Sequence, residues 1–527
     1  MLKSPAIRGL TESLTDLSPT EWRTILARLR RARLLAAEDP QNPRHLDTHP
    51  LVREYFGEQL QSQRTEAWRE CNRRLCDYYR ALAPQLPDSF REMEPLFLAV
   101  ICGCNAGLFR EVLHEVYIPR IQRGDISFAA NVLGARGALL SVLAHFFEQG
   151  RWGFPAEMGL EGQTLTAEDQ LVILMQAGLL LTATRGLGAP EVRICYDCAL
   201  SLCHSLNRPL LLYAALIGQW RVSLQTDKLT ATMQIAKRVY SLAQKRNDAG
   251  LMIGACQALA CTLCFLGDFE TTQRYAMRGV QIWRSGGLKP PVEEVSAPAV
   301  MCLCFEALSK SHLGEIASSR PIMAEAISLA KELNDMYGLA VALIFAALLA
   351  IGERNLAEVE RHSSDLIELS TRHHYAQWLA VGSILRGWAR SASGETSDGI
   401  SWIEDGTRNY RATGAVLAMP FYLALKAEAL YLADRTSEAL GAIREAEALV
   451  ERSEERWCCA ELHRLRGVFL AAIGADETQI EASFCEAIRR AKRQKAISVL
   501  KRAEGTYAEY QCQKAIGSGG SGFRLPL

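Results

Sequence analysis

Three basic residues recur at one position of a forty-residue repeat: Arg386, Lys426 and Arg466. A column of cations with this spacing could hold an acidic peptide or a phosphorylated metabolite, because guanidinium and ammonium groups form charge-assisted hydrogen bonds with carboxylates and phosphates. Other polar residues on the same predicted helices are candidates for this surface. They are Gln219, Gln257, Lys310, Arg390 and His463. The alternative for each residue is a solvated helix face, which is the usual place for a charged side chain.

Cysteine pairs are the second feature that could carry chemistry. The sixteen cysteines include two C-x-x-C pairs, Cys195/Cys198 and Cys261/Cys264, and His204 follows the first pair. A structural zinc site needs two such pairs brought together, usually from loops. Both pairs lie in the middle of predicted helices. We therefore interpret the cysteines as small, reduced core residues of a cytosolic protein and predict no metal site, with zinc or redox chemistry as the less favoured alternative.

Motifs for the common hydrolytic chemistries do not occur in the sequence. There is no Gly-x-x-x-x-Gly-Lys-Ser/Thr phosphate loop, no His-Glu-x-x-His and no Gly-x-Ser-x-Gly. The glycine- and serine-rich residues 517–522 are not followed by the lysine and helix that a phosphate loop requires. We predict no catalytic residue and no cofactor in this chain, and we interpret residues 515–527 as a flexible tail or a cloning scar.

Helical hairpins would position the candidate binding residues. Small residues stand forty apart, and a turn residue follows each by about seven positions. The small residues are Ala307, Ala347, Gly387, Ala427 and Gly467. A small side chain on the first helix of a hairpin lets the second helix pack closely, and apolar residues spaced by four and seven keep one stripe of the second helix facing it. Such stripes occur at Ala439, Ile443 and Ala446, and at Ile480, Phe484 and Ala487.

This period predicts an all-α fold, a right-handed α-solenoid of eight tetratricopeptide-like hairpins over residues 161–514. Trp220 occupies the small-residue position of one early copy, which makes that copy the weakest match. A HEAT or armadillo array is the alternative, since its period of roughly 40–47 residues also fits. Solenoids of this kind usually bind other molecules on the concave surface formed by their first helices.

The amino-acid composition limits the classes of partner that we expect for this chain. Lys plus Arg and Asp plus Glu number 59 each, so no overall field attracts nucleic acid or an anionic membrane. The longest apolar run, residues 339–351, is too short to span a bilayer and is expected to be a buried first helix. We therefore predict a cytoplasmic protein with no direct nucleic-acid or membrane partner.

The first 160 residues follow another pattern. Ser18-Pro19-Thr20-Glu21 predicts a helix start with a capping box, a polar turn covers residues 37–44, and a second helix begins near residue 50. Helix, polar turn and helix are typical of the end of a winged-helix domain. We predict a winged-helix C-terminal part over residues 1–62 and a helical connector over residues 63–160.

Residues 48–54, Thr-His-Pro-Leu-Val-Arg-Glu, resemble the Met-His-Asp-type motif that ends the winged helix of STAND ATPases, the class that contains apoptotic and NB-ARC ATPases. The resemblance implies that His49 contacts the β-phosphate of bound ADP in the resting state. Pro50 departs from the aspartate of the motif. Residues 384–389 and 457–467 are similar to the last repeats of bacterial predicted ATPases and of the maltose-regulon transcriptional activator, which join a phosphate-loop module to tetratricopeptide-like repeats.

The resemblance implies that the chain is the C-terminal part of a STAND-type signalling ATPase. The ATPase module, with its ADP or ATP, would lie upstream. A protein or peptide ligand, or a small-molecule inducer, would bind the concave face and release an autoinhibited state, with a possible homo-oligomer on activation. The candidate binding residues are Arg386, Arg390, Lys426, His463 and Arg466. The alternative function is a free-standing repeat adaptor that scaffolds partner proteins.

Overall fold

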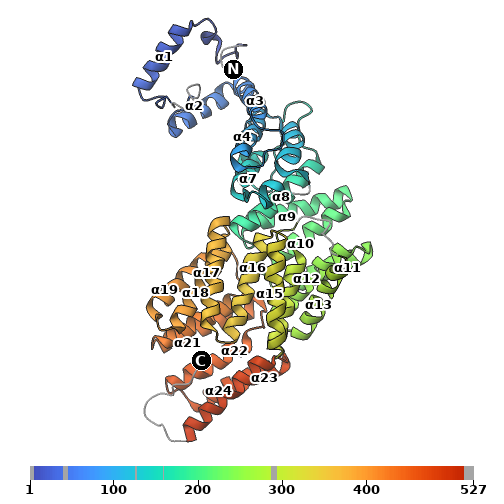
Figure 1. Ribbon diagram of the computed structural model, residues 1–527, viewed down its shortest axis with the longest axis vertical. Helices are drawn as coiled ribbons and strands as arrows, with labels where there is room; N and C mark the ends of the chain where they lie inside the picture. The colour runs from blue at the N-terminus through green and yellow to red at the C-terminus, as the bar shows by residue number, and fades with distance from the viewer. Residues whose placement is uncertain (1–4, 39–45, 125–126, 158, 287–293, 516–527) are drawn as a thin grey trace. The chain divides into compact units, whose positions relative to one another are not determined.

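The computed structural model describes residues 5–38, 46–124, 127–157, 159–286 and 294–515 (Figure 1). Contacts divide the chain into two compact units, Met1–Asp169 and Gln170–Leu527. Within the described residues, every regular element is a helix, and the one isolated β-bridge joins Phe147 and Pro155. Most of the predicted polar turn at 37–44 and, apart from residue 515, the predicted tail at 515–527 lie outside the described residues.

The first unit is built from helices of unequal length. Its elements are η1 (Glu12–Leu14), α1 (Pro19–Arg31), α2 (Pro50–Gln63), α3 (Thr65–Leu82), α4 (Phe90–Ala106), α5 (Phe109–Val112), η2 (Leu113–Gln122), α6 (Phe128–Asn131), α7 (Arg136–Leu143), η4 (Ala144–Phe146) and η5 (Glu148–Gly150). Helix α1 starts as the sequence predicts, because the Ser18 amide donates to Glu21 Oε2 (2.8 Å) and the Glu21 amide donates to Ser18 Oγ (3.3 Å). The winged-helix assignment of residues 1–62 stays a prediction.

Buried polar contacts hold the longer helices of this unit together. Arg120 is buried on η2, and its guanidinium donates to carbonyl oxygens at the end of α3, among them those of Ala83 (3.2 Å) and Pro84 (2.9 Å). Those carbonyls have no partner inside the helix, so the arginine caps them. Gly103 on α4 lets Val112 pack against the α4 backbone, where a Cβ atom would overlap the valine side chain.

The second unit is a stack of helical hairpins, and the division between the units falls in the first turn of α8. The described residues form eight hairpins and a final single helix: α8 (Ala167–Arg185) with α9 (Pro190–Leu206), α10 (Pro209–Thr226) with α11 (Leu229–Arg246), α12 (Ala249–Phe265) with α13 (Phe269–Gly286), α14 (Pro298–His312) with α15 (Ile316–Glu332), α16 (Met336–Gly352) with α17 (Leu356–His373), α18 (Ala376–Ala392) with α19 (Thr396–Ala412), α20 (Met419–Leu432) with α21 (Thr436–Ser453), α22 (Cys459–Ala472) with α23 (Glu477–Arg493), and α24 (Ile497–Ala515). The predicted tetratricopeptide-like α-solenoid is confirmed.

The small residues of the forty-residue period lie where the two helices of a hairpin touch. A Cβ atom on Gly387 would lie 2.6 Å from the carbonyl oxygen of Gly399 on α19, and one on Gly467 would lie 2.7 Å from the ring of Phe484 on α23. Ala307, Ala347 and Ala427 are fully buried at the equivalent positions. A larger side chain at any of these positions would push the helices apart, so the sequence period records the hairpin contact.

The early copy that contains Trp220 departs from this pattern. Gly218 packs against the ring of Tyr196 on α9, as does Gly178 from α8, so that a Cβ on either glycine would overlap the ring. Trp220 instead faces α12, where its Nε1 donates to Thr262 Oγ1 (2.9 Å). Gly218 thus packs on the second helix of the preceding hairpin, and the contact between α10 and α11 includes the hydroxyl groups of Ser223 and Thr232 (2.8 Å).

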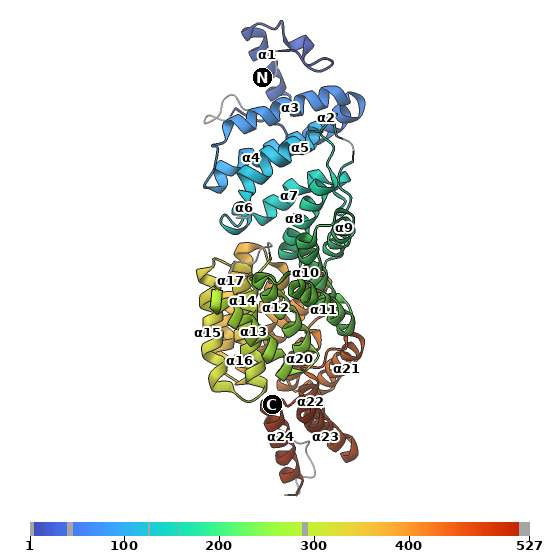
Figure 2. The same ribbon diagram turned by 90° about the vertical axis from the view of Figure 1, so that its right-hand side faces the viewer.

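The hairpins coil into a superhelix whose successive turns touch (Figure 2). The Val416 amide donates to the Gln225 carbonyl oxygen (2.9 Å), and the Arg456 amide donates to the Phe265 carbonyl oxygen (2.7 Å), each 191 residues away along the chain. Ser498 Oγ on α24 donates to the Ser311 carbonyl oxygen (2.5 Å) across 187 residues. One superhelical turn thus takes nearly the same length of chain at all three contacts.

Gly188 allows one of these turn contacts to form. A Cβ atom on Gly188 would overlap the backbone of Gly414 and Ala415, although the glycine itself has no positive φ. We predict that Gly188→Ala lowers the free energy of unfolding by about 1–3 kcal/mol, because the two turns must separate to admit the methyl group. Urea unfolding measures the loss, and hydrogen exchange at the Val416 amide locates it.

Gly441→Ala is the matched control. Gly441 lies on α21, and nothing stands within 4 Å of its Cβ position. The same substitution there should raise stability by about 0.5–1 kcal/mol, because alanine is the better helix former. Equal effects of the two substitutions would contradict the tight turn contact.

Candidate functional site

The structure places the predicted cation column between hairpins. Each cation lies on the first helix of one hairpin and pairs with a glutamate on the second helix of the preceding hairpin. The pairs are Arg386–Glu360 (2.8 Å), Lys426–Glu404 (2.9 Å) and Arg466–Glu447 (3.2 Å). The three cations share one structural position, as the period predicts, but a carboxylate already neutralises each of them. Their role in ligand binding stays a prediction.

Arg390 and His463 have equally close neighbours. Arg390 lies 3.5 Å from Glu395, and its guanidinium stands 5.8 Å from the ring centroid of Trp402. His463 is largely buried, and burial together with the nearby Arg490 guanidinium lowers its pKa to about 4. The imidazole is therefore uncharged at neutral pH and is a poor partner for an anion.

His49 lies in the first unit, at the start of α2. It is the N-cap residue, and its Nδ1 accepts a hydrogen bond from the Leu51 amide (3.3 Å). The side chain is exposed. Its predicted contact with a nucleotide phosphate stays a prediction.

A cavity of the second unit lies inside the superhelix. Its wall comes mainly from the first helices α10, α12, α14, α16 and α20, with Trp378 from α18 and Trp457 from the segment before α22. Gln257, one of the polar candidates from the sequence, lines this cavity. None of Arg386, Arg390, Lys426, His463 and Arg466 does.

Aromatic side chains form much of the wall. They are Trp220, Phe265, Phe305, Tyr337, Phe345, Trp378, Tyr410, Phe421, Tyr422 and Trp457. Several of them contact each other, such as Phe305 with Phe345 (5.0 Å between ring centroids) and Phe421 with Trp457 (5.0 Å). A wall of this kind binds flat or apolar groups by contact area and edge-to-face packing.

Two polar atoms in this wall lack a hydrogen-bond partner among the described residues. They are Oε1 of Gln257 and Nε1 of Trp378. Because Gln257 is 3% exposed and Trp378 is 8% exposed, water can supply little of the missing hydrogen bonding. Gln257 and Thr262 are the amide- or hydroxyl-bearing side chains of α12, and Thr262 has partners in Trp220 and the Ala258 carbonyl. An unpaired buried acceptor is destabilising, which marks Gln257 as a residue with a use other than stability.

Both turns of the superhelix contribute to the cavity wall. Trp220, Leu224 and Gln225 come from the early turn, and Tyr410 and Leu417 come from the later one. Gln225 ties the two sides together, because its side-chain oxygen accepts from Tyr410 Oη (3.3 Å) and its carbonyl accepts from the Val416 amide. The Leu187 amide donates to Gln377 Oε1 (2.8 Å) beside them. The width of the cavity therefore depends on the distance between turns.

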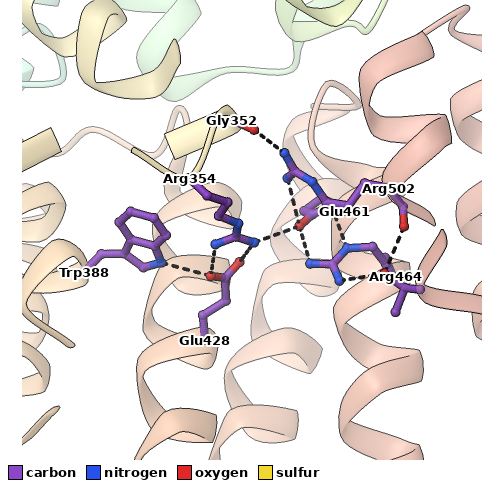
Figure 3. A network of polar contacts seen from close by, with 8 residues as sticks. Gly352, Arg354, Trp388, Glu428, Glu461, Arg464 and Arg502 are labelled. Atoms are coloured by element: carbon purple, nitrogen blue, oxygen red, sulfur yellow. Dashed lines mark hydrogen bonds and ion pairs between the residues drawn. The ribbon is translucent and has the colours of Figure 1, made fainter. Parts of the chain in front are cut away.

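A second pocket adjoins the aromatic cavity, with Leu308, Leu348, Phe421 and Trp457 common to both linings. Figure 3 shows the charged network at its edge. Arg354 pairs with Glu428 (2.7 Å), which also accepts from Trp388 Nε1 (3.0 Å).

Glu461 is the second anion of this network. Arg464, which is fully buried, donates to both of its oxygens (2.7 and 3.0 Å), and Arg502 lies 3.5 Å away (Figure 3). Burial would raise the pKa of Glu461, but Arg464 and Arg502 outweigh it and hold that pKa well below its usual range. Arg502 also donates to the Gly352 carbonyl oxygen (2.5 Å), so the network ties α24 to the C-terminal end of α16.

The cysteines lie mostly in the helix interiors. Cys195 and Cys198 lie on α9, and Cys261 and Cys264 lie on α12, where burial raises the pKa of both thiols. Across the described ranges, no group of three or more His, Cys, Asp or Glu side chains could hold a metal ion. No helix within those ranges combines the length and apolar character that a membrane span requires.

The apolar character of two first helices is a sequence signal for the cavity that the forty-residue period does not reveal. Helix α16 is apolar on every face, and α12 is nearly so. A first helix whose concave side faced open solvent would carry polar residues there. Apolar residues on all sides instead indicate that the concave side is enclosed.

Comparisons with known proteins bear on the fold. No family model matches the chain. An uncharacterized protein of Rhizobium meliloti (strain 1021) is 23% identical over 355 residues, which cover 67% of this chain and 34% of that protein. The chain thus spans about a third of the length of the curated relative it matches.

Three solved structures are similar in their helical repeats. NprR in complex with its cognate peptide NprX is 12% identical, with 66% of this chain and 98% of that chain covered and a TM-score of 0.44. A Rap protein complexed with Competence and Sporulation Factor is 10% identical, with 62% and 88% covered and a TM-score of 0.40. A STAND protein with a tetratricopeptide repeat sensor from Pyrococcus horikoshii is 14% identical, with 85% and 72% covered and a TM-score of 0.33. At sequence identities and TM-scores this low, the similarity concerns the fold alone.

Replacing the unpaired glutamine should stabilise the protein. We predict that Gln257→Met raises the free energy of unfolding by about 1 kcal/mol, because methionine fills the same space without an unsatisfied acceptor. The matched control is Gln377→Met. Gln377 is equally buried, but it accepts from the Leu187 amide, so its loss should cost about 1–2 kcal/mol. Urea unfolding of both variants checks the opposite signs.

His312 should make stability depend on pH. Burial lowers its pKa to about 4, and the ring stacks on Phe269 with centroids 4.2 Å apart. Between pH 6.5 and pH 4, the unfolded chain binds a proton at this histidine that the folded protein does not bind. The contribution of the neutral imidazole to the free energy of unfolding is therefore present in full above pH 6.5 and is lost as the pH falls toward 4.

We predict that His312→Phe reduces the loss of stability between pH 7 and pH 5 by on the order of 2 kcal/mol. Urea unfolding at the two pH values, for the wild type and the variant, measures this difference. His204→Phe is the control, since His204 is exposed on α9 and its replacement should leave the dependence unchanged. An unchanged slope in His312→Phe would show that its imidazole is protonated in the folded state.

Proposed function

We propose that the second unit is the ligand-sensing domain of a STAND-type signalling ATPase. The observation that carries this proposal is the cavity inside the superhelix, whose wall belongs to two successive turns. A molecule in this cavity contacts both turns at once. Its binding energy therefore depends on the spacing between the turns, which is the condition for a ligand to shift a conformational equilibrium.

The contacts between turns are suited to such a shift. They include single hydrogen bonds, such as Val416 to Gln225 and Arg456 to Phe265, and exposed ion pairs such as Lys495–Glu270 (2.7 Å). Exposed pairs of this kind contribute about 0–1 kcal/mol each. The hairpins, in contrast, are held by closely packed small and apolar residues. The turns can therefore separate or close while each hairpin stays intact.

The sequence resemblance supplies the rest of the proposal. Residues 48–54 and the last repeats resemble STAND ATPases, and in that class a repeat sensor restrains an ATPase that opens and oligomerises. An ATPase module with ADP or ATP would accompany this chain, and His49 would contact the nucleotide. The Rhizobium relative extends well beyond the matched region, which is compatible with such a larger protein.

The alternative function is a free-standing repeat adaptor that binds partner proteins. An adaptor would use an open concave groove or the outer helices, and an enclosed aromatic cavity would contribute little to it. The three cations that could attract an acidic partner are already paired with glutamates. The position of the ligand thus distinguishes the two functions.

We expect ligands of the sensor to protect two amides together. A panel of metabolites and short peptides is added to the full chain, with tryptophan fluorescence as the first readout, because Trp220, Trp378 and Trp457 line the cavity. For each binder, hydrogen exchange should slow by about tenfold or more at the Val416 and Arg456 amides, as a gain of about 1.4 kcal/mol in turn closure requires. Amides of the outer helix α21 serve as the internal reference.

The triple variant Arg386→Ala/Lys426→Ala/Arg466→Ala is the matched control for the surface. It should bind the same compounds with unchanged affinity, since its cations do not line the cavity. Loss of binding in this variant, or binding that leaves both amides unaffected, would contradict the proposal and favour the adaptor.

A further inference from the structure

The cavity has the lining of a small-molecule site. Apolar and aromatic side chains make up most of its wall, and a few polar groups stand among them. Hydrogen bonds cross between the turns beside it, from Leu187 to Gln377 and from Val416 to Gln225. An extended peptide needs a groove that stays open along its length. Contacts that join the two walls leave space for a compact molecule instead.

The charge of the cavity wall further restricts which compact molecules can bind. Arg221 is the charged residue among the described side chains that line the cavity, and it pairs with the buried Glu294. The side chains of this pair are 8% and 3% exposed. An ionised ligand group would therefore leave water without gaining a free counter-charge, which is strongly unfavourable in an apolar site. The wall discriminates against anions and cations alike.

The two unpaired atoms define what the ligand must offer. Oε1 of Gln257 can accept a hydrogen bond, and Nε1 of Trp378 can donate one. Both residues line the cavity, and both are more than nine-tenths buried. A ligand with one donor and one acceptor would satisfy both atoms, and the aromatic wall would cover the rest of its surface.

We infer that this cavity binds a compact, uncharged, largely aromatic small molecule that donates a hydrogen bond to Gln257 and accepts one from Trp378. This inference rests on the proposed sensing function and specifies the class of its ligand. Polar sugars, phosphorylated metabolites and extended peptides are disfavoured by the same wall. Specificity against close analogues follows from the two polar atoms, since a buried group left unpaired lowers affinity.

Two fluorescent probes with the same ring skeleton test the charge preference. N-phenylnaphthylamine is uncharged and carries one N–H, and anilinonaphthalene sulfonate adds only the sulfonate. Each is titrated into the full chain. We expect a saturable site of one probe per chain for the amine and at least tenfold weaker binding for the sulfonate. Equal or tighter binding of the sulfonate would overturn the inference.

Two substitutions test the polar atoms. Gln257→Met should weaken N-phenylnaphthylamine at least threefold while it stabilises the free protein, a combination that a purely structural residue would not show. Propionyl dimethylaminonaphthalene has a carbonyl acceptor and no donor, so Trp378→Phe should weaken it at least threefold and affect the amine less. If neither substitution changes either affinity, these atoms do not contact the ligand and the inference fails.

Further controls locate the probe and separate this inference from the proposed function. Ile473→Ser removes an exposed apolar side chain outside the described cavity wall and should leave both titrations unchanged, whereas Ile344→Trp narrows the cavity and should abolish them. If the probes do not bind but a peptide or a charged metabolite protects the Val416 amide, the ligand class is wrong and the sensing function stands. If nothing binds inside the superhelix, both are wrong.

Discussion

Close contact between the two helices of each hairpin is the constraint on which the second unit depends. Gly387 and Gly467 leave space for a carbonyl oxygen and for a phenylalanine ring, and fully buried alanines occupy the equivalent positions in other hairpins. This contact fixes the angle between helices, and the same angle repeated from hairpin to hairpin sets the pitch of the coil. The contacts between turns and the enclosed cavity follow from that pitch.

The sequence predicts the hairpins well because their determinants are local. A small residue, a turn residue and an apolar stripe all lie within one forty-residue copy, so their spacing can be recognised directly. The capping box at Ser18 and Glu21 is another local pattern that the structure confirms.

The cavity could not be predicted in the same way, because its wall joins residues about 190 positions apart. Gln225 and Val416 meet only when small rotations between successive hairpins add up to one full turn, and no single repeat specifies that sum. The sequence placed Arg386, Lys426 and Arg466 correctly in one column but could not show the glutamates that face them. Gln257 was among the sequence candidates, although its missing partner is visible only in the structure.

The interior combines two kinds of environment that respond differently to a change in pitch. Its aromatic part is held by contact area, which declines gradually as turns separate. Its ionic part tolerates little displacement, because Glu461 is held by Arg502 on α24 (3.5 Å) and by Arg354 before α17 (3.9 Å), and a buried charge that loses its partners is strongly destabilised. Arg502 carries that constraint to α24 and to the Gly352 carbonyl. Movement between turns should therefore be greatest near the aromatic cavity and smallest at the α24 end, which would act as the fixed point of the coil.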